Sequence, residues 1–230
     1  MAAAGTSPRI VWLRRELRLR DQAAFVAAAS QGPVIPVYVL DDETPKHRKM
    51  GGASRWWLHH SLASLDAELR EKGSRLILRR GRCEEVLPRL AEETGACEVH
   101  ALRHYEPWWR NAEKAVGKQV ALCLHDGNYL APPGSILSGS GTPYKIYTPF
   151  WRALNERMPP ADPLASPQKL DAPANWPESE MLDDWSLVPS KPDWAGGMRD
   201  MWQPGEQGAH RRLKAFADEA ARYEARRNLP

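Results

Sequence analysis

The chain has 230 residues, a formal net charge of +3 and a hydrophobic content of 42%. This length allows one large domain or two small ones, and the hydrophobic content is sufficient for a buried core. A net charge this small gives no argument for nucleic-acid binding by the chain as a whole, which leaves only local basic patches. No apolar run approaches the ~20 residues of a membrane span, and Met1–Ser7 lacks the features of a signal peptide.

The cysteines and histidines indicate neither disulfides nor a metal site. Cys83, Cys97 and Cys123 show no CxxC pairing and stand in apolar or helical contexts. Disulfides are rare in the cytosol, so we expect reduced, buried thiols in a cytoplasmic protein. His59 and His60 adjoin each other early in a helical segment, without a Cys or acidic partner at ligand spacing. We therefore expect no bound metal.

The first 131 residues alternate between short apolar runs and helical patterns, which predicts a βαβα order and a parallel sheet covered on both faces. Strands are expected at 10–13, 34–40, 76–78, 99–102 and 120–124. Helices are expected at 22–29, 54–72, 84–93 and 107–116. Asp21 should cap the first helix, Gly73 should end the second and Pro88 should interrupt the third. The predicted fold class is α/β, a Rossmann-like doubly wound sheet of five parallel strands.

The helix predicted at 54–72 has apolar residues at helical spacing. Its buried face is expected to comprise Trp57, Leu58, Ser61, Leu62, Leu65 and Leu69.

The loop after the first strand carries four arginines, Arg14, Arg15, Arg18 and Arg20. It contains no glycine, so neither the GxGxxG fingerprint of NAD- or FAD-binding domains nor a P-loop is present. The end of a parallel strand nevertheless faces the ligand-binding edge of an open α/β sheet. These guanidiniums need carboxylates, phosphates or a ligand as partners, and a salt-bridged surface loop is the alternative.

The chain changes character after Tyr129, where turn signals and prolines replace regular patterns. Tryptophans persist between Pro159 and Gly205, which favours an ordered connector over a disordered linker. Helical periodicity returns over Glu206–Arg227. We therefore divide the chain into an α/β domain at 1–131, a connector at 132–205 and the start of a helical domain at 206–230.

Aromatic residues also surround Lys145 in the first part of the connector, at Tyr144, Tyr147 and Phe150. They could form a stacking platform for nucleic acid. Packing of the α/β domain onto the connector is the favoured interpretation, because buried aromatic side chains usually serve packing.

Four segments in order resemble the photolyase/cryptochrome family: IVWLRRELRLRD (10–21), RHYEPWWR (103–110), YKIYTPFWRA (144–153) and the PDWAGG connector with its following helix (191–216). Together they cover nearly the whole chain and are most similar to bacterial cyclobutane pyrimidine dimer photolyases. The resemblance implies a deoxyribodipyrimidine photo-lyase, a carbon–carbon lyase of DNA repair. Such flavoproteins use blue light and reduced FAD to split pyrimidine dimers in DNA.

The resemblance also implies which parts of such an enzyme this sequence holds. Tyr223 matches the first FAD contact of the family's helical domain, whose remaining flavin, electron-transfer and DNA-binding segments would follow Pro230. We therefore expect no catalytic residue here and no repair by these 230 residues alone. Damaged DNA would be bound through the rest of the helical domain, which would also pack on the apolar surface that we expect this chain to expose.

In the family the α/β domain binds or adjoins an antenna chromophore, which is a folate, a deazaflavin or a flavin. Tyr105 and Glu106 match folate-binding members, but their following Asn–Glu pair is replaced by Trp108 and Trp109 here. These tryptophans could stack on a planar chromophore. Alternatively, at least one of them packs into the core.

A second candidate antenna pocket is expected at the carboxyl edge of the sheet. It would be bounded by Arg14, Arg15, Asp41, Asp42, Arg55 and His104. Arginines there would suit an anionic tail, because they form bidentate contacts with phosphate and carboxylate. The alternative is that Arg14, Asp41 and Glu106 pair with one another and only stabilise loops.

Two other interpretations remain open from the sequence. One is a fragment of a cryptochrome blue-light receptor, which would share this half of the protein. The other is a stand-alone α/β nucleotide-binding module, which the missing phosphate loop disfavours.

Overall fold

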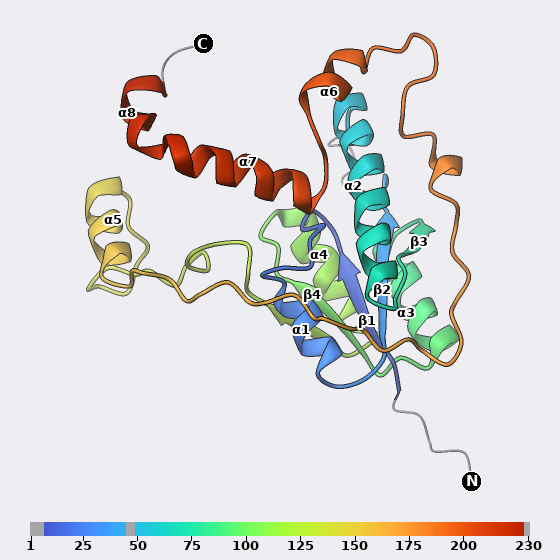
Figure 1. Ribbon diagram of the computed structural model, residues 1–230. Coiled ribbons are helices and arrows are strands. Elements are labelled where there is room, and N and C mark those ends of the chain that lie inside the picture. Colours follow the sequence, from blue (N-terminus) through green and yellow to red (C-terminus); the bar gives the residue numbers. More distant parts are fainter. Residues whose placement is uncertain (1–6, 45–48, 228–230) are drawn as a thin grey trace.

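The computed structural model describes residues 7–44 and 49–227, and it contains an α/β domain with a five-stranded sheet (Figure 1). The strands are β1 (Arg9–Leu13), β2 (Val34–Leu40), β3 (Ile77–Arg80), β4 (Glu98–Leu102) and β5 (Leu122–His125). All pairs are parallel and the order is β3-β2-β1-β4-β5. The predicted fold class is confirmed, and each strand lies within two residues of its predicted ends.

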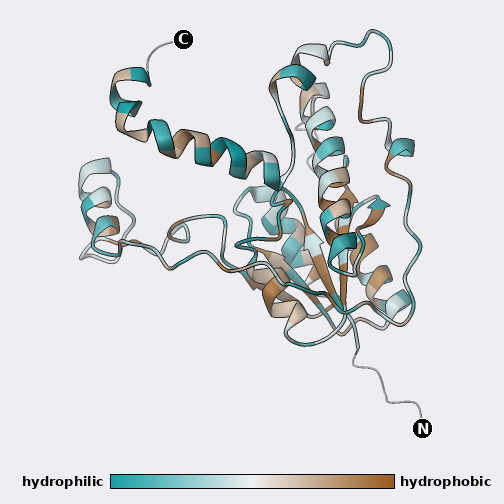
Figure 2. Ribbon diagram, in the orientation of Figure 1, coloured by the Kyte–Doolittle hydropathy of each residue, from teal (hydrophilic) through white to brown (hydrophobic). Residues whose placement is uncertain are grey.

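Four helices cover the two faces of the sheet. They are α1 (Ala23–Ala29), α2 (Gly52–Glu71), α3 (Cys83–Thr94) and α4 (Pro107–Val116). One apolar cluster joins the sheet to α1 and α2, and a second joins the opposite face to α3 and α4. Figure 2 shows the apolar strands at the centre with mixed helices outside them, as the burial of both strand faces requires.

The start of α1 differs from the prediction. Gln22 caps the helix, because its side chain accepts a hydrogen bond from the Ala24 amide. Asp21 has a positive φ of 52°, and its carboxylate instead accepts from the backbone amide of Leu164 in the connector. The prediction of Asp21 as the cap is wrong because a contact from a distant segment uses its side chain.

Pro88 does not interrupt α3, which runs unbroken from Cys83 to Thr94. A proline inside a helix leaves the carbonyl four residues earlier, here that of Glu84, without its usual amide donor. The side chain of Gln119 supplies a donor instead, with its Nε2 atom 2.9 Å from that carbonyl oxygen. The predicted interruption is wrong because the lost hydrogen bond is replaced from outside the helix.

The helix α2 confirms its predicted end, since Gly73 has a left-handed φ of +85°. Five of the six residues predicted for its buried face are buried, but Trp57 is not: it is 39% exposed, and its neighbour Trp56, at 1% exposed, is buried in its place. Trp57 contacts Trp202 of the connector edge-to-face, with ring centroids 5.9 Å apart. Trp57 therefore belongs to the surface where the connector returns.

The three cysteines are free, but they differ in burial. Cys83 is buried, Cys123 is half-buried and Cys97 is exposed. The prediction of buried thiols is therefore wrong for Cys97, which lies in the turn before β4.

The connector is ordered, as predicted, and part of it follows the edge of β3, which was not predicted. The Glu180 amide donates to the Leu78 carbonyl at 2.9 Å, and the Leu78 amide donates to Ser179 Oγ at 3.0 Å. Leu170 and the short 3₁₀ helix η2 (Asp183–Trp185) bury apolar side chains against the α1/α2 side of the core. The connector thus covers an edge strand that would otherwise offer unpaired backbone groups.

The first part of the connector extends away from the sheet and carries helix α5 (Tyr147–Asn155), which Figure 1 shows apart from the α/β domain. Tyr147 and Trp151 are exposed and stack on each other, and Tyr144 contacts Phe150 edge-on. The prediction that these aromatics pack the α/β domain onto the connector is wrong. The sequence shows that such residues are apolar, but it does not show which surface they contact.

The chain ends in α6 (Gly196–Met201), α7 (Glu206–Glu219), η3 (Ala220–Arg222) and α8 (Tyr223–Arg226), so the single predicted helix at 206–227 changes direction at its end. Leu213, Phe216 and Tyr223 are each about half exposed or more. This agrees with the predicted exposure of apolar surface. No helix within residues 7–44 and 49–227 is long and apolar enough to cross a membrane.

Candidate functional site

A cleft of about 900 Å³ lies at the carboxyl edge of the sheet. Its walls are the loop after β1, the end of β2, the first turns of α2 and α4, and the start of α7. The strand order reverses between β1 and β4, and ligands of open α/β proteins bind at such a switch point. The volume is within the range of small-molecule pockets.

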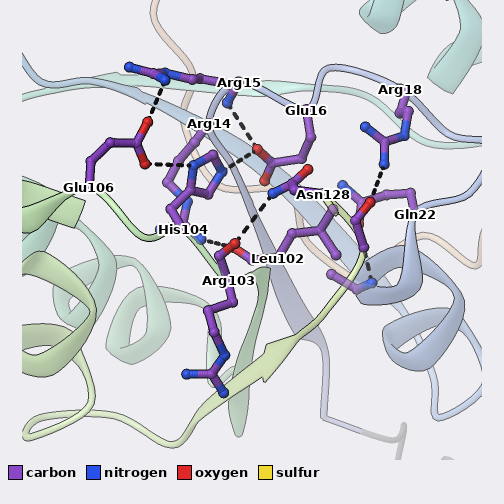
Figure 3. A network of polar contacts seen from close by, with 12 residues as sticks. Arg14, Arg15, Glu16, Arg18, Gln22, Leu102, Arg103, His104, Glu106 and Asn128 are labelled. Atoms are coloured by element: carbon purple, nitrogen blue, oxygen red, sulfur yellow. Dashed lines mark hydrogen bonds and ion pairs between the residues drawn. The ribbon is translucent and has the colours of Figure 1, made fainter. Parts of the chain in front are cut away.

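Arg14 forms the buried base of this region (Figure 3). Its Nη1 atom lies 2.6 Å from Glu113 Oε1, and its Nη2 atom donates to the Leu102 carbonyl. The guanidinium also lies over the rings of Trp12 and Trp109, 4.3 and 5.5 Å from their centroids. Arg14 thus fixes the loop after β1 to β4 and α4 through both of its terminal nitrogens. For Arg14, the structure therefore shows the alternative that the sequence left open, an internal ion pair. Its partner is Glu113, however, and not Asp41.

Glu16 and His104 form a second buried pair beside Arg14. Glu16 Oε2 lies 2.7 Å from His104 Nε2 and also accepts from the Arg15 amide at 3.0 Å. Burial raises the pKa of Glu16, but the hydrogen bond with His104 and the charge of Arg14 outweigh it, so the pKa lies below its ordinary value. The carboxylate therefore stays ionised inside the protein.

Arg15 is more accessible than Arg14, with 63% of its side chain exposed. It forms an ion pair with Glu106, whose other oxygen lies 3.6 Å from His104 Nδ1. Burial raises the pKa of Glu106, yet its own backbone amide, Arg15 and His104 together lower it below the ordinary value. Arg15 also borders the cleft, and most of its side chain remains exposed in spite of the ion pair.

The two aspartates after β2, Asp41 and Asp42, bond mainly to neighbouring segments of the protein. Asp41 accepts from the backbone amides of Glu43, Thr44 and Cys83, so it holds the loop after β2 and the start of α3. Asp42 pairs with Arg55 at 2.6 Å. Both aspartates line the cleft, whereas Arg55 does not.

Trp108 and Trp109 lie on α4 and both line the cleft, although their surroundings differ. Trp109 contacts Trp12 of the core edge-to-face at 6.1 Å. The indole nitrogen of Trp109 is buried and has no hydrogen-bond partner among the described residues. Trp108 is half-buried and lies at the same wall. One tryptophan therefore packs into the core, and the other is the better candidate for stacking on a ligand.

The wall formed by α7 was not predicted from the sequence. The carboxylate of Glu206 accepts hydrogen bonds from the amides of Leu19 and Arg20, at 2.6 and 3.0 Å, which fixes the start of α7 over the loop after β1. His210 and Leu213, one and two turns later, then line the cleft. An acidic residue in the first turn of a helix is a common cap, so the sequence carried no signal for its role between segments.

Tyr223 lies outside the cleft, on the short helix α8. Its side chain is 54% exposed and contacts Phe216 edge-to-face at 5.8 Å. A single exposed tyrosine does not form a flavin pocket, so Tyr223 and its contact Phe216 do not by themselves fit FAD.

Comparison with known proteins identifies the family. The profile of the DNA photolyase family matches residues 9–169. The chain therefore belongs to this family. It is 43% identical to a deoxyribodipyrimidine photo-lyase of Agrobacterium fabrum, over 98% of this chain and 48% of that protein.

Comparison with solved structures gives the same result. A class III photolyase from Agrobacterium tumefaciens superposes with a TM-score of 0.91 at 42% identity, covering 100% of this chain and 49% of that one. The fold also matches an archaeal photolyase from Sulfolobus tokodaii, solved with two FAD molecules and implying a novel light-harvesting cofactor. That match has a TM-score of 0.65 at 23% identity and covers 84% of this chain and 44% of that one. The chain thus spans about half the length of these photolyases.

Proposed function

We propose that the chain is the N-terminal, light-harvesting half of a photolyase that repairs cyclobutane pyrimidine dimers with FAD and blue light. The observation that carries this proposal is the 43% identity that extends over 98% of this chain but only 48% of the photo-lyase. The cleft at the carboxyl edge of the sheet supports a light-harvesting role, because it combines volume, aromatic walls and accessible cationic groups.

The proposed ligand of the cleft is a planar heteroaromatic chromophore with an anionic tail. Trp108 offers an aromatic face for stacking, and Arg15 offers a guanidinium for the tail. Arg14, by contrast, holds the walls in place through Glu113. When bound, such a chromophore absorbs light and transfers its excitation energy to the flavin of the enzyme.

Repair itself is assigned to the other half of the enzyme. An excited flavin must lie close to a dimer that has left the DNA stack, and the protein must bind and orient both. Tyr223 matches one flavin contact of the family and is exposed here, so we expect no dimer repair from these 230 residues alone. Damaged DNA and FAD would be held by the remaining part of a photolyase.

Two assays on the purified chain test the proposal. In the first, 5,10-methenyltetrahydrofolate, FMN and 8-hydroxy-5-deazaflavin are titrated separately, and quenching of tryptophan fluorescence is measured. Saturable binding of one of them with one site per chain is expected. In the second, an oligonucleotide with a thymine dimer is irradiated with blue light in the presence of reduced FAD. Repair above the dark control would contradict the assignment of catalysis to the other half.

A further inference from the structure

Four side chains that the cleft does not use gather on one face of the strands β4 and β5. They are Glu98, His100, Cys123 and His125. His100 and Cys123 are register neighbours in the parallel ladder, and Glu98 precedes His100 by two residues, which puts it on the same face. The ligand atoms of Glu98, His100 and Cys123 all lie within 4.8 Å of one another. A carboxylate, an imidazole and a thiol therefore converge on one point.

The spacing of these atoms suits a tetrahedral metal ion. His100 Nε2 lies 3.2 Å from Glu98 Oε2. Two nitrogen or oxygen ligands at about 2.0 Å from a tetrahedral Zn²⁺ are about 3.3 Å apart, so this pair needs almost no movement. A thiolate ligand binds at about 2.3 Å, which puts its sulfur about 3.5 Å from the other ligand atoms. The Cys123 sulfur lies within 4.8 Å of the Glu98 and His100 ligand atoms and would move to that distance on binding.

His125 is placed to orient the central ligand. Its Nε2 atom lies 3.0 Å from His100 Nδ1, and the two rings are stacked with an interplanar angle of 11°. If His100 binds an ion through Nε2, its Nδ1 carries the proton and donates to His125. Metal-bound histidines usually have such a partner, which fixes the ring and its tautomer.

The carboxylate of Glu98 is available for this role. Arg9 stands beside Glu98 in the β1–β4 register, but its guanidinium donates to the carbonyls of Ser7 and Gln31 instead. His100 is the hydrogen-bond partner of Glu98 among the described side chains. Glu98 is one-third exposed whereas His100 is buried, so the group of side chains is open to water on the side of Glu98.

We propose that Glu98, His100 and Cys123 bind one Zn²⁺ ion, with water as the fourth ligand and His125 as the positioning residue. Cys123 binds as the thiolate, so one proton is released for each ion bound. The ion joins β4 to β5, which is the edge strand of the sheet, and so stabilises that edge. The site is distinct from the chromophore cleft, since none of its residues lines that cleft.

Cobalt substitution tests the proposal, because Co²⁺ reports its ligands in its absorption spectrum. The purified chain is stripped with a chelator and titrated with Co²⁺ and then with Zn²⁺. One Co²⁺ per chain, intense tetrahedral d–d bands and a thiolate-to-cobalt charge-transfer band are expected, all displaced by one equivalent of Zn²⁺. Weak octahedral bands without charge transfer would overturn the proposal.

Matched variants identify the ligands. Cys123→Ser should abolish the charge-transfer band, while Cys97→Ser, at the exposed cysteine nearby, should keep it. His125→Gln should weaken Zn²⁺ binding about 10- to 100-fold without loss of the band, as expected for a positioning residue. A band that survives in Cys123→Ser, or that disappears in Cys97→Ser, would overturn the assignment. If Cys123→Ser fails to fold, the charge-transfer band of Cys97→Ser still identifies the thiolate ligand. Only Cys83 and Cys123 remain in that variant, and Cys83 is fully buried.

Discussion

Arg14 and Glu113 form a buried ion pair, 2.6 Å long, between the loop after β1 and helix α4. Glu113 also accepts a hydrogen bond from the His104 amide, and Arg14 also donates to the Leu102 carbonyl. The pair therefore joins the two loops that meet at the switch point of the sheet. Its role is to hold the walls of the cleft, since both side chains are almost fully buried.

Replacing Arg14 by Met should destabilise the fold strongly. The carboxylate of Glu113 would stay buried without its cation, which typically costs about 3–5 kcal/mol in the free energy of unfolding. Arg110→Met on the exposed side of the same helix is the control, with an expected change within about 0.5 kcal/mol. Urea unfolding measures both, and equal losses for the two variants would contradict the structural role of Arg14.

Because of the Glu16–His104 pair, the stability of the fold should depend on pH in the acid range. The pKa of Glu16 is lower in the folded protein than its ordinary value of 4.5, so the ionised carboxylate stabilises the fold above that value. This contribution is lost as the pH falls from 4.5 through the folded pKa. Glu16→Gln should therefore be less stable than the wild type at neutral pH, and the difference should shrink in acid.

Urea unfolding of both proteins at a series of pH values measures this difference. Glu43→Gln, at an exposed position near the end of β2, serves as the control and should show no such pH-dependent difference. A difference between wild type and Glu16→Gln that is constant across the acid range would contradict the account.

Gln119 should matter only because of Pro88. Its hydrogen bond to the Glu84 carbonyl replaces the one that the proline removes, so Gln119→Ala should cost about 0.5–1.5 kcal/mol. In a Pro88→Ala background the helix regains its own donor, and Gln119→Ala should then cost much less. A double-mutant cycle measures this coupling, and strictly additive losses would show that the two residues act independently.

The apolar face of α7 should promote self-association. Phe216 is 48% exposed and lies near Tyr223, and large exposed apolar patches usually mark interfaces. Phe216→Glu should lower both the binding of a hydrophobic dye and the apparent mass in light scattering. Ala217→Glu adds the same charge at the next position and should change both much less. A wild-type chain that is monomeric at high concentration and binds little dye would contradict this prediction.

The sheet could be predicted from the sequence because each strand is a short apolar run between polar loops, which is a local signal. The four-helix arrangement followed from the same alternation. The surface that each helix buries is harder to predict, because adjacent residues such as Trp56 and Trp57 point about 100° apart and both are apolar. The structure buries the first and leaves the second at the cleft.

The details of the site could not be predicted for a different reason. Arg14 and Glu113 are 99 positions apart, and Glu206 contacts an amide 187 positions away. No local pattern encodes such partners. From the sequence, the tryptophan pair and the arginine loop were predicted as two separate candidate pockets, whereas the structure brings both to one cleft. Its other residues, Trp57, Glu16 and His210, and the supporting Glu113 were found only through tertiary contacts.

Variants of Trp108 and Arg15 test chromophore binding by the cleft at single residues. The measurement is the dissociation constant of the chromophore that binds the wild-type chain, determined by fluorescence titration. Trp108→Ala should weaken binding roughly tenfold or more, because stacking of a planar ring on an aromatic side chain contributes about 1–3 kcal/mol. Arg15→Ala should also weaken it through loss of the contact to the anionic tail.

Matched controls are Trp194→Ala and Arg89→Ala, at exposed positions outside the cleft, and both should bind as the wild type does. Only the two cleft variants are expected to lose affinity. Wild-type affinity in Trp108→Ala and Arg15→Ala, or no saturable binding of any of the three chromophores to the wild-type chain, would contradict it.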